Sequence, residues 1–316
     1  MTSDTWPRAV TPVESAVGMA ASAAAGIWSP VLRPVLVRSL DRMFRDGETA
    51  RTGDPASGDE GWMGPDSVAW RVHSDTSMFV GGITALAFQA LHPRVMAGVA
   101  DHSDFRHDPL GRLRRTAQFV GATCFGTSTE AAGACATVRR VHEQVHGTTP
   151  DGRPYEASDP ELVDWVHCTE FAAFVAAHRL YGERPVRRRD LDRYAHEVAR
   201  IGVELGDVDA PTDWTQLTSH LSRHRTQCVV GEQARAAMSF LEEPPLPGIV
   251  HRIYPVLFRG AIAALPEWAR VLWGISAVST AEISACRALV RGLGAALGPS
   301  PGLAAARARA EAARAA

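Results

Sequence analysis

A histidine with aromatic neighbours stands in the stretch DPELVDWVHCTEFAAFVAAHRLYG, residues 159–182. Asp159 or Ser158 fits a helix N-cap, Pro160 fits the first turn, and Glu161 places a negative charge at the positive end of the helix dipole. These residues predict that a helix begins here. Steps of three and four residues from Val163 define one broad face, which holds His167, Glu170, Phe171, Phe174 and His178.

His167 has two chemical interpretations. A buried ring nitrogen without a partner costs about 1–3 kcal/mol, so a core histidine would hydrogen-bond a backbone carbonyl or a carboxylate. Neutral imidazole is also the commonest metal ligand among side chains. The helix alone leaves both interpretations open.

A second group of polar residues lies in GRLRRTAQF, residues 111–119. On a helix, Arg112, Arg115, Thr116 and Phe119 fall on one stripe. Such a stripe is usually a solvated basic face. It is also suited to a dianionic group, because arginine forks match paired carboxylates such as the two propionates of a haem.

Two adjacent glycines, Gly81 and Gly82, fall inside the predicted helix SMFVGGITALAFQALH, residues 77–92. Each costs about 1 kcal/mol relative to alanine in a helix interior. A closely packed neighbouring helix or a flat macrocycle lying against the backbone would explain them.

The chain reads as a single multi-helix globular domain of the all-α class. Apolar periodicity and stop signals predict the following further helices: 110–125, 129–146, 188–204, 211–227, 231–242 and 260–294. PPLPG, residues 244–248, is a rigid break between the last two of these. The expected organisation is an N-terminal helical arm (1–45), an exposed Gly/Asp/Pro/Ser-rich loop (46–66), the main helical domain (67–300) and a C-terminal tail (301–316) that is solvated or frayed.

Composition excludes several classes of function. The 316 residues are 46% hydrophobic, which suffices for a large core, and 33 basic against 35 acidic residues leave no global field for nucleic acid. Every basic residue is arginine, which excludes a P-loop or Schiff-base lysine and indicates a GC-rich bacterial genome. The run AVGMAASAAAGIW, residues 16–28, is too short to cross a bilayer.

The cellular location is predicted to be the cytoplasm. MTSDTWPRAV lacks the basic region of a secretory signal, and the five cysteines form no CxxC pair, so we expect free thiols in a reducing compartment. The cysteines are Cys124, Cys135, Cys168, Cys228 and Cys286.

Three ordered motifs, GG…FQALHP, DPLGRLRRT and DPELVDWVH, resemble the catalytic domain shared by rubber oxygenases (latex-clearing proteins) and the oxygenase of mycophenolic acid biosynthesis. The likeness covers roughly residues 65–270 and makes the main domain oxygenase-like. It implies an all-α fold around a b-type haem, with His167 as the proximal iron ligand. It further implies Arg112 and Thr116 at the haem site, with Phe171 and Phe174 walling the macrocycle.

The sequence departs from this family at one haem-site position. Rubber oxygenases can carry a lysine beside the haem-site threonine that caps the iron in a closed state, whereas Arg115 stands here. A guanidinium stays protonated and cannot ligate iron, so we expect an open or water-filled sixth position near Arg115. Neither Asp101 nor Asp104 is a confident match for the acidic residue proposed as a base in rubber cleavage.

The leading hypothesis is a haem-dependent oxygenase or oxidase whose partners are dioxygen and an apolar small molecule, such as an alkene or isoprenoid chain. His73 is the candidate distal polar group; a surface or helix-capping histidine is the alternative.

Three rival classes of protein remain: a haem or lipid carrier without turnover, a structural helical protein and a non-haem di-iron oxidase. The di-iron reading requires two Glu-x-x-His pairs, and only Glu143 with His146 is present. His142, His146, His196 and His224 are expected on the surface or on helices without converging ligands.

Overall fold

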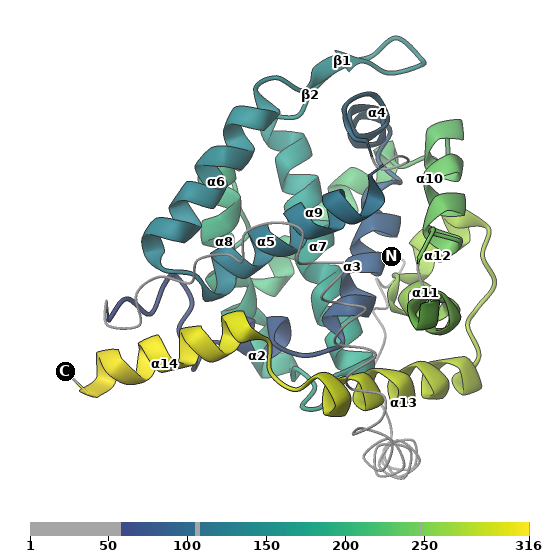
Figure 1. The fold of residues 1–316 in the computed structure, drawn as a ribbon. Helices are drawn as coiled ribbons and strands as arrows, with labels where there is room; N and C mark the ends of the chain where they lie inside the picture. The colour runs from purple at the N-terminus through teal and green to yellow at the C-terminus, as the bar shows by residue number, and fades with distance from the viewer. Residues whose placement is uncertain (1–57, 105–107, 247, 316) are drawn as a thin grey trace.

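The computed structural model describes residues 58–104, 108–246 and 248–315 (Figure 1). The helices are, in chain order, α2 (Val68–His73), α3 (Met78–Gln89), α4 (Pro93–His102), α5 (Pro109–Phe125), α6 (Ser128–His142), α7 (Pro160–Tyr181), η2 (Arg188–Asp190), α8 (Leu191–Leu205), α9 (Trp214–His224), η3 (Arg225–Gln227), α10 (Glu232–Glu242), α11 (Gly248–Ala264), α12 (Glu267–Trp273), α13 (Thr280–Leu297) and α14 (Pro301–Ala315). The short strands β1 (His146–Thr148) and β2 (Pro154–Glu156) form one antiparallel hairpin. The predicted all-α class is confirmed. The expected arm (1–45) and the apolar run 16–28 lie outside the described residues.

The helix that carries His167 begins where the sequence predicts. The Asp159 carboxylate accepts a hydrogen bond from the backbone N–H of Glu161, Pro160 occupies the first turn, and Gly182 follows the last helical residue. The α5 helix begins in the same manner, because the Asp108 carboxylate accepts from the N–H of Gly111. Local capping chemistry therefore sets the start of both helices that bear the main site motifs.

The predicted helix 260–294 is divided into parts of α11, α12 and α13. Pro266 stands at the N-cap of α12, and Gly274 ends that helix with a φ of 70°, in the left-handed region that favours glycine. Ser279 and Glu282 then form a capping box that starts α13. The prediction of a single helix was wrong because apolar periodicity continues across these stops.

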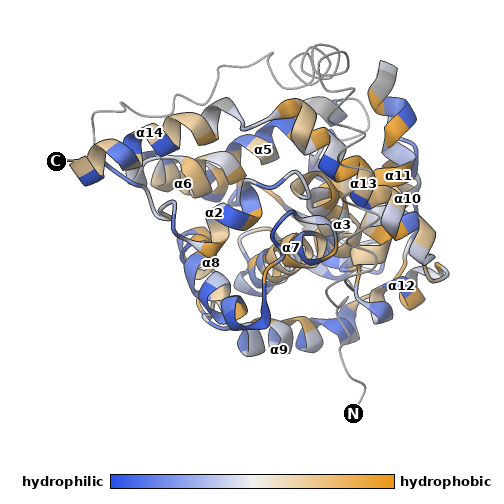
Figure 2. Cartoon of the chain, turned by 90° about the horizontal axis from the view of Figure 1, so that it is seen from below, coloured by the Kyte–Doolittle hydropathy of each residue, from blue (hydrophilic) through white to orange (hydrophobic). Residues whose placement is uncertain are grey.

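Helix α7 lies at the centre of the molecule and is buried along nearly its whole length. The α3 helix packs along it, while α11 and α13 contact it on one side and α8 and α9 on another (Figures 1 and 2). The outer helices carry hydrophilic residues on their solvent sides in Figure 2. A helix so enclosed holds its side chains in fixed positions, which suits it to carry a site.

Gly81 and Gly82 have different environments on α3. A Cβ added at Gly81 would lie 3.1 Å from Cδ1 and 3.3 Å from the backbone Cα of Phe174, so this glycine permits the close packing of α3 on α7. A Cβ at Gly82 would meet no atom of the described structure within 4 Å. Helix packing therefore explains Gly81 and leaves Gly82 unexplained by protein contacts.

We expect the two alanine variants to move stability in opposite directions. Gly81→Ala should lower the free energy of unfolding by about 1–3 kcal/mol, because the added methyl group presses on the α7 backbone. Gly82→Ala should raise it by up to about 1 kcal/mol through helix propensity. Urea unfolding of the two variants checks this; equal effects at both positions would contradict the packing explanation.

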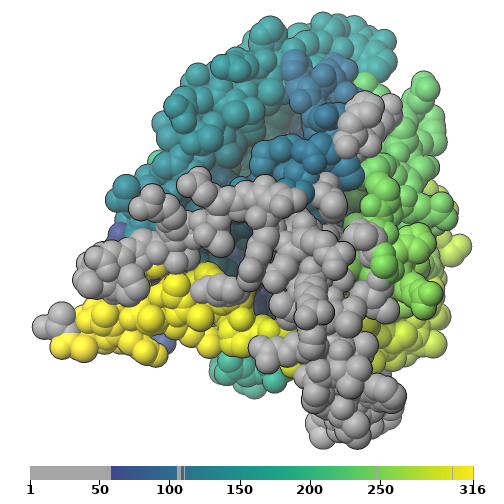
Figure 3. Space-filling view, viewed as in Figure 1, coloured from purple at the N-terminus to yellow at the C-terminus, as the bar shows by residue number. Residues whose placement is uncertain are grey.

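The ends of the described chain are packed against each other, unlike the expected exposed loop and solvated tail. Met63 is buried in the segment 58–66, so the described part of the predicted loop is not fully exposed. Arg309 of α14 is fully buried and donates hydrogen bonds to the backbone carbonyls of Asp59 and Phe125. In the space-filling view α14 runs along the lower left edge of the molecule, and the surface is hollowed between α5 and α6 (Figure 3).

Within residues 58–104, 108–246 and 248–315, no helix is both long and apolar enough to cross a membrane. All five cysteines are buried and free of disulfides, as the cysteine pattern predicts.

Candidate functional site

His167 is buried, and both of its ring nitrogens lack a hydrogen-bond partner in the described structure. Its side chain lies in the protein interior, and neither Nδ1 nor Nε2 has a partner among the described residues. The ring packs edge-on against Phe171, with 4.7 Å between centroids. On the other side a Cβ at Gly202 of α8 would lie 3.0 Å from Nδ1, so glycine is what allows α8 to come so close.

The electrostatic environment keeps His167 neutral. Burial lowers the pKa of His167 to about 4. The negative charge of Asp164 raises this pKa, and the positive field of His220 lowers it, but burial has the largest effect. A neutral imidazole has a free lone pair at neutral pH. The core-histidine interpretation requires a carbonyl or carboxylate partner, and the described structure supplies none.

His73 lies in the same region and is buried, so it is not the surface histidine of the alternative interpretation. Its Nε2 is 3.0 Å from the hydroxyl of Tyr194 on α8. Its ring stacks on Phe171 at a centroid distance of 5.9 Å and packs edge-on against Phe174 at 5.3 Å. Burial lowers the pKa of His73 to about 3, so this side chain is also neutral.

Glu170 is a member of this group whose role sequence reasoning did not assign. It lies one helical turn from His167, and burial raises its pKa to about 7 although part of the side chain remains exposed. Its charge also contributes to the raised pKa of Tyr194. The only signal in the sequence was a single acidic residue on an otherwise apolar helix face.

The arginine and threonine stripe of α5 lies nearer the surface. Arg112 is half-buried, and its guanidinium donates to the Ser103 hydroxyl at 2.8 Å. Thr116 and Arg115 are exposed; the Thr116 hydroxyl donates to the Arg112 carbonyl, while Arg115 pairs weakly with Asp108 at 3.5 Å. Among the described residues no hydrogen bond joins this stripe to His167.

The two ends of α5 have different surroundings. Phe119 packs, partly buried, against the core cluster that contains Phe171 and Phe174. Towards the start of the helix Leu113 is 40% exposed. Near its end, a Cβ at Gly121 would meet no described atom within 4 Å. The stripe thus continues from the polar surface into the aromatic group around His167.

A second cluster of polar side chains lies where α7 meets α9. The Asp164 carboxylate accepts hydrogen bonds from Nδ1 of His220 and Nε2 of His224, each at 2.8 Å, and from the Cys168 thiol at 3.2 Å. The expectation that His224 lacks converging partners was wrong. Sequence reasoning missed the cluster because Asp164 and His220 are 56 residues apart.

The remaining predicted polar residues are dispersed. His146 lies in β1 and is exposed, whereas Glu143 ends α6, so the single Glu-x-x-His pair does not share a helix face. His196 is exposed, and Asp101 accepts a hydrogen bond from the Tyr155 hydroxyl. The described structure therefore offers no set of residues for a di-iron carboxylate site of that kind.

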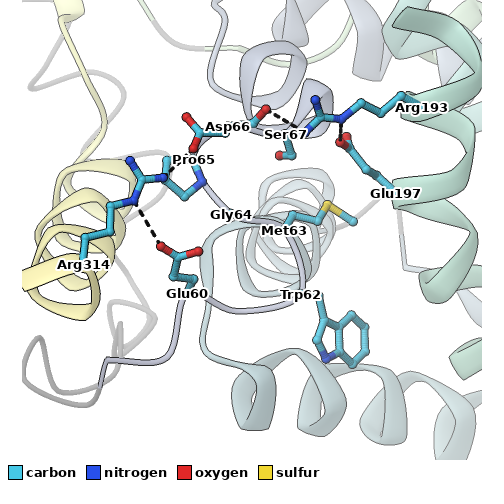
Figure 4. A pocket seen from close by; sticks show the side chains of 10 residues that line it. All are labelled: Glu60, Trp62, Met63, Gly64, Pro65, Asp66, Ser67, Arg193, Glu197 and Arg314. Atoms are coloured by element: carbon cyan, nitrogen blue, oxygen red, sulfur yellow. Dashed lines mark hydrogen bonds and ion pairs between the residues drawn. The ribbon is translucent and has the colours of Figure 1, made fainter. Parts of the chain in front are cut away.

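Two surface depressions lie away from His167. The first has a volume of about 220 Å³ (Figure 4). Its rim carries ion pairs of Arg314 with Glu60 and Asp66, and an ion pair of Arg193 with Glu197. The second, of about 730 Å³, is lined largely by arginines of the segment 184–189. Neither is lined by a residue that the sequence predicts for the haem site.

The fold and the residues around His167 define an all-α protein with a buried histidine beside aromatic side chains, and this histidine has no partner in the described part of the chain. Residues 70–297 match the family described as ER-bound oxygenase mpaB/B'/Rubber oxygenase, catalytic domain. The match spans most of the chain, so the protein belongs to this oxygenase family. No curated protein and no solved structure gave a significant match.

Buried neutral histidines make stability depend on pH. Burial lowers the pKa of His92 to about 4, while an unfolded histidine titrates near 6.5, so the unfolded chain binds more protons between these values. The free energy of unfolding should therefore fall as pH falls from about 6.5 to about 4.

We expect His92→Gln to reduce this slope by up to about 1.4 kcal/mol per pH unit, the value for one titrating group. His196→Gln, at an exposed position on α8, is the control and should leave the slope unchanged. Chemical denaturation at several pH values measures it. An identical slope for wild type and His92→Gln would show that His92 does not titrate as described.

Proposed function

We propose that the protein is a haem b-dependent oxygenase acting on an apolar small molecule, and that His167 would bind the haem iron. The observation that carries the proposal is the neutral, buried imidazole of His167, which has no hydrogen-bond partner among the described residues. An unpartnered buried imidazole is unfavourable in a purely structural role, whereas metal ligation uses its lone pair. Membership of the oxygenase family supports the same choice.

The surroundings of His167 fit a flat macrocycle. Phe171 and Phe174 supply apolar walls beside the imidazole. The half-buried guanidinium of Arg112 and the hydroxyl of Thr116 lie on one stripe and would hold the propionates. Bound in this way, a haem supplies the one-electron and dioxygen chemistry that side chains lack.

The protein's own groups would control binding, water and protons. The apolar cluster around Phe171 excludes water and favours an alkene or isoprenoid substrate over a charged one. His73, fixed by its contact with the Tyr194 hydroxyl, offers the interior an uncharged hydrogen-bonding group. Glu170, whose pKa of about 7 lies near neutrality, is able to hold or release a proton at its carboxylate.

Arg115 distinguishes this chain from relatives that carry a lysine at that position. Its side chain is exposed and paired weakly with Asp108, and a guanidinium keeps its proton. We therefore propose that no side chain at this position closes the site, which remains open to small ligands.

The test is purification of the protein with haem supplied, followed by absorption spectroscopy and an oxygen electrode. A Soret band with a b-type pyridine haemochrome, together with oxygen uptake dependent on an added isoprenoid alkene, supports the proposal. Haem binding without oxygen-dependent loss of any alkene would instead identify a carrier. If the protein binds no haem when haem is supplied, His167 is a structural core histidine.

A further inference from the structure

The side-chain cluster at the contact of α7 and α9 has the composition of a metal site that is separate from His167. Asp164 and Cys168 are one turn apart on α7, and His220 approaches them from α9. One potential ligand atom of each of these three residues lies within 4.8 Å of the others. All three residues are buried.

Two buried carboxylates lie in this part of the described structure, Asp164 and Asp207. Burial raises the pKa of the Asp164 carboxyl. The hydrogen bonds from His224, His220 and Cys168 lower it by more, so that the pKa falls to about 2 and the carboxylate is ionised at neutral pH. Asp207, just after α8, is a second buried carboxylate nearby, and burial together with the field of Asp164 raises its pKa to about 6. Two carboxylates thus share an interior region without a guanidinium bonded to either among the described residues.

One oxygen of Asp207 gives independent support for a ligand. Asp207 is 2% exposed, and its Oδ2 has no hydrogen-bond partner in the described structure, while Oδ1 accepts from the backbone N–H of Asp209. An unsatisfied buried carboxylate oxygen beside a second carboxylate is costly without a positive charge. A divalent cation would supply that charge.

We propose that Asp164, Cys168 and His220 bind a divalent cation of the zinc class, which ties α7 to α9. A carboxylate, a thiolate and an imidazole form a set typical of tetrahedral Zn²⁺, and a thiolate selects zinc over magnesium or calcium. The fourth position is left to water. His224, which donates to Asp164, orients that ligand from the second coordination shell.

The proton balance of binding follows from the structure. Burial and the charges of Asp164 and Asp207 raise the pKa of the Cys168 thiol, so the thiol is protonated without metal and releases one proton as the sulfur–metal bond forms. His220 binds through the lone pair of Nδ1, which moves its proton to Nε2. Asp209 stands 3.7 Å from that nitrogen and would stabilise the N–H.

The site is distinct from the proposed haem ligand, although the two share a helix. His167 faces Phe171 and Gly202, whereas its neighbour Cys168 donates to Asp164. A cation bound at Asp164 and Cys168 would fix α7 on both sides of His167. The metal content is therefore predicted to be independent of haem loading.

The experiment is elemental analysis of the full chain purified without chelator, with haem iron counted separately by the pyridine haemochrome. We expect stoichiometric zinc at any haem content. After dialysis against chelator, Co²⁺ is titrated in, and thiolate ligation gives a charge-transfer absorption in the near ultraviolet. Cys168→Ser should lose this absorption, while Cys135→Ser, which alters a buried cysteine on α6, should keep it.

Two results would overturn the proposal. One is a wild-type protein that holds no zinc, gives no Co²⁺ charge-transfer absorption and shows no rise in unfolding temperature with Zn²⁺; the cluster is then a hydrogen-bonded network alone. The other is a Co²⁺ absorption that persists in Cys168→Ser. Should that variant not fold, the zinc content and the Co²⁺ absorption of the wild type decide, because that absorption requires a thiolate ligand.

Discussion

His167→Ala loses the Soret band of haem-supplied protein and, with it, oxygen uptake. Replacing an outer-shell partner of a metal ligand costs about 10–100-fold in affinity, so loss of the axial ligand itself should reduce haem retention by at least about tenfold. The remaining fold should persist, because the ring makes no hydrogen bond in the described structure. Absorbance at the Soret maximum per mole of protein is the measurement.

Two comparisons separate loss of a ligand from loss of the fold. His196→Ala removes an exposed histidine from α8 and should retain full haem content. Added imidazole should restore a Soret band to a His167→Gly variant, since the space left by the ring is the size of the added ligand. Full haem retention in His167→Ala would rule out His167 as the axial ligand.

Arg309→Met destabilises the protein by about 2–5 kcal/mol. The fully buried guanidinium satisfies the carbonyls of Asp59 and Phe125, and each buried acceptor left without a donor costs about 1–3 kcal/mol. Methionine fills similar volume, so the loss reports the hydrogen bonds more than a cavity. Arg307→Met, at an exposed position two residues earlier, should change stability by less than about 0.5 kcal/mol.

Guanidinium-chloride unfolding of the two variants gives the comparison directly. Equal stability of Arg309→Met and Arg307→Met would show that α14 does not hold the segment around Asp59. In that case the sequence-based expectation of a solvated tail would apply to the C-terminal residues after all.

Local sequence signals identified most of what positions His167. The N-cap of Asp159 and the apolar face of residues 160–181 predicted α7, because capping and helical periodicity depend on residues within one or two turns. The three ordered motifs pointed to the oxygenase family. The family match over residues 70–297 then established it. The haem-site roles of Arg112, Arg115 and Thr116 stay predictions.

Long-range packing determined the features that sequence reasoning missed. The partners of Asp164 come from α9, and the burial of His73 depends on Tyr194, which is 121 residues away. Apolar periodicity shows which face of a helix is buried but not which distant helix covers it. The pKa of Glu170 likewise depends on the surrounding protein and not on neighbouring residues.

The sequence by itself determined the fold class, the helix that carries the histidine and the family of the chain. Only the tertiary structure decided that His167 has no hydrogen-bond partner among the described residues, that Asp164, Cys168 and His220 converge, and that Arg309 is buried. The physical reason is that helix formation and capping are local, whereas desolvation and the meeting of polar groups depend on how distant helices pack.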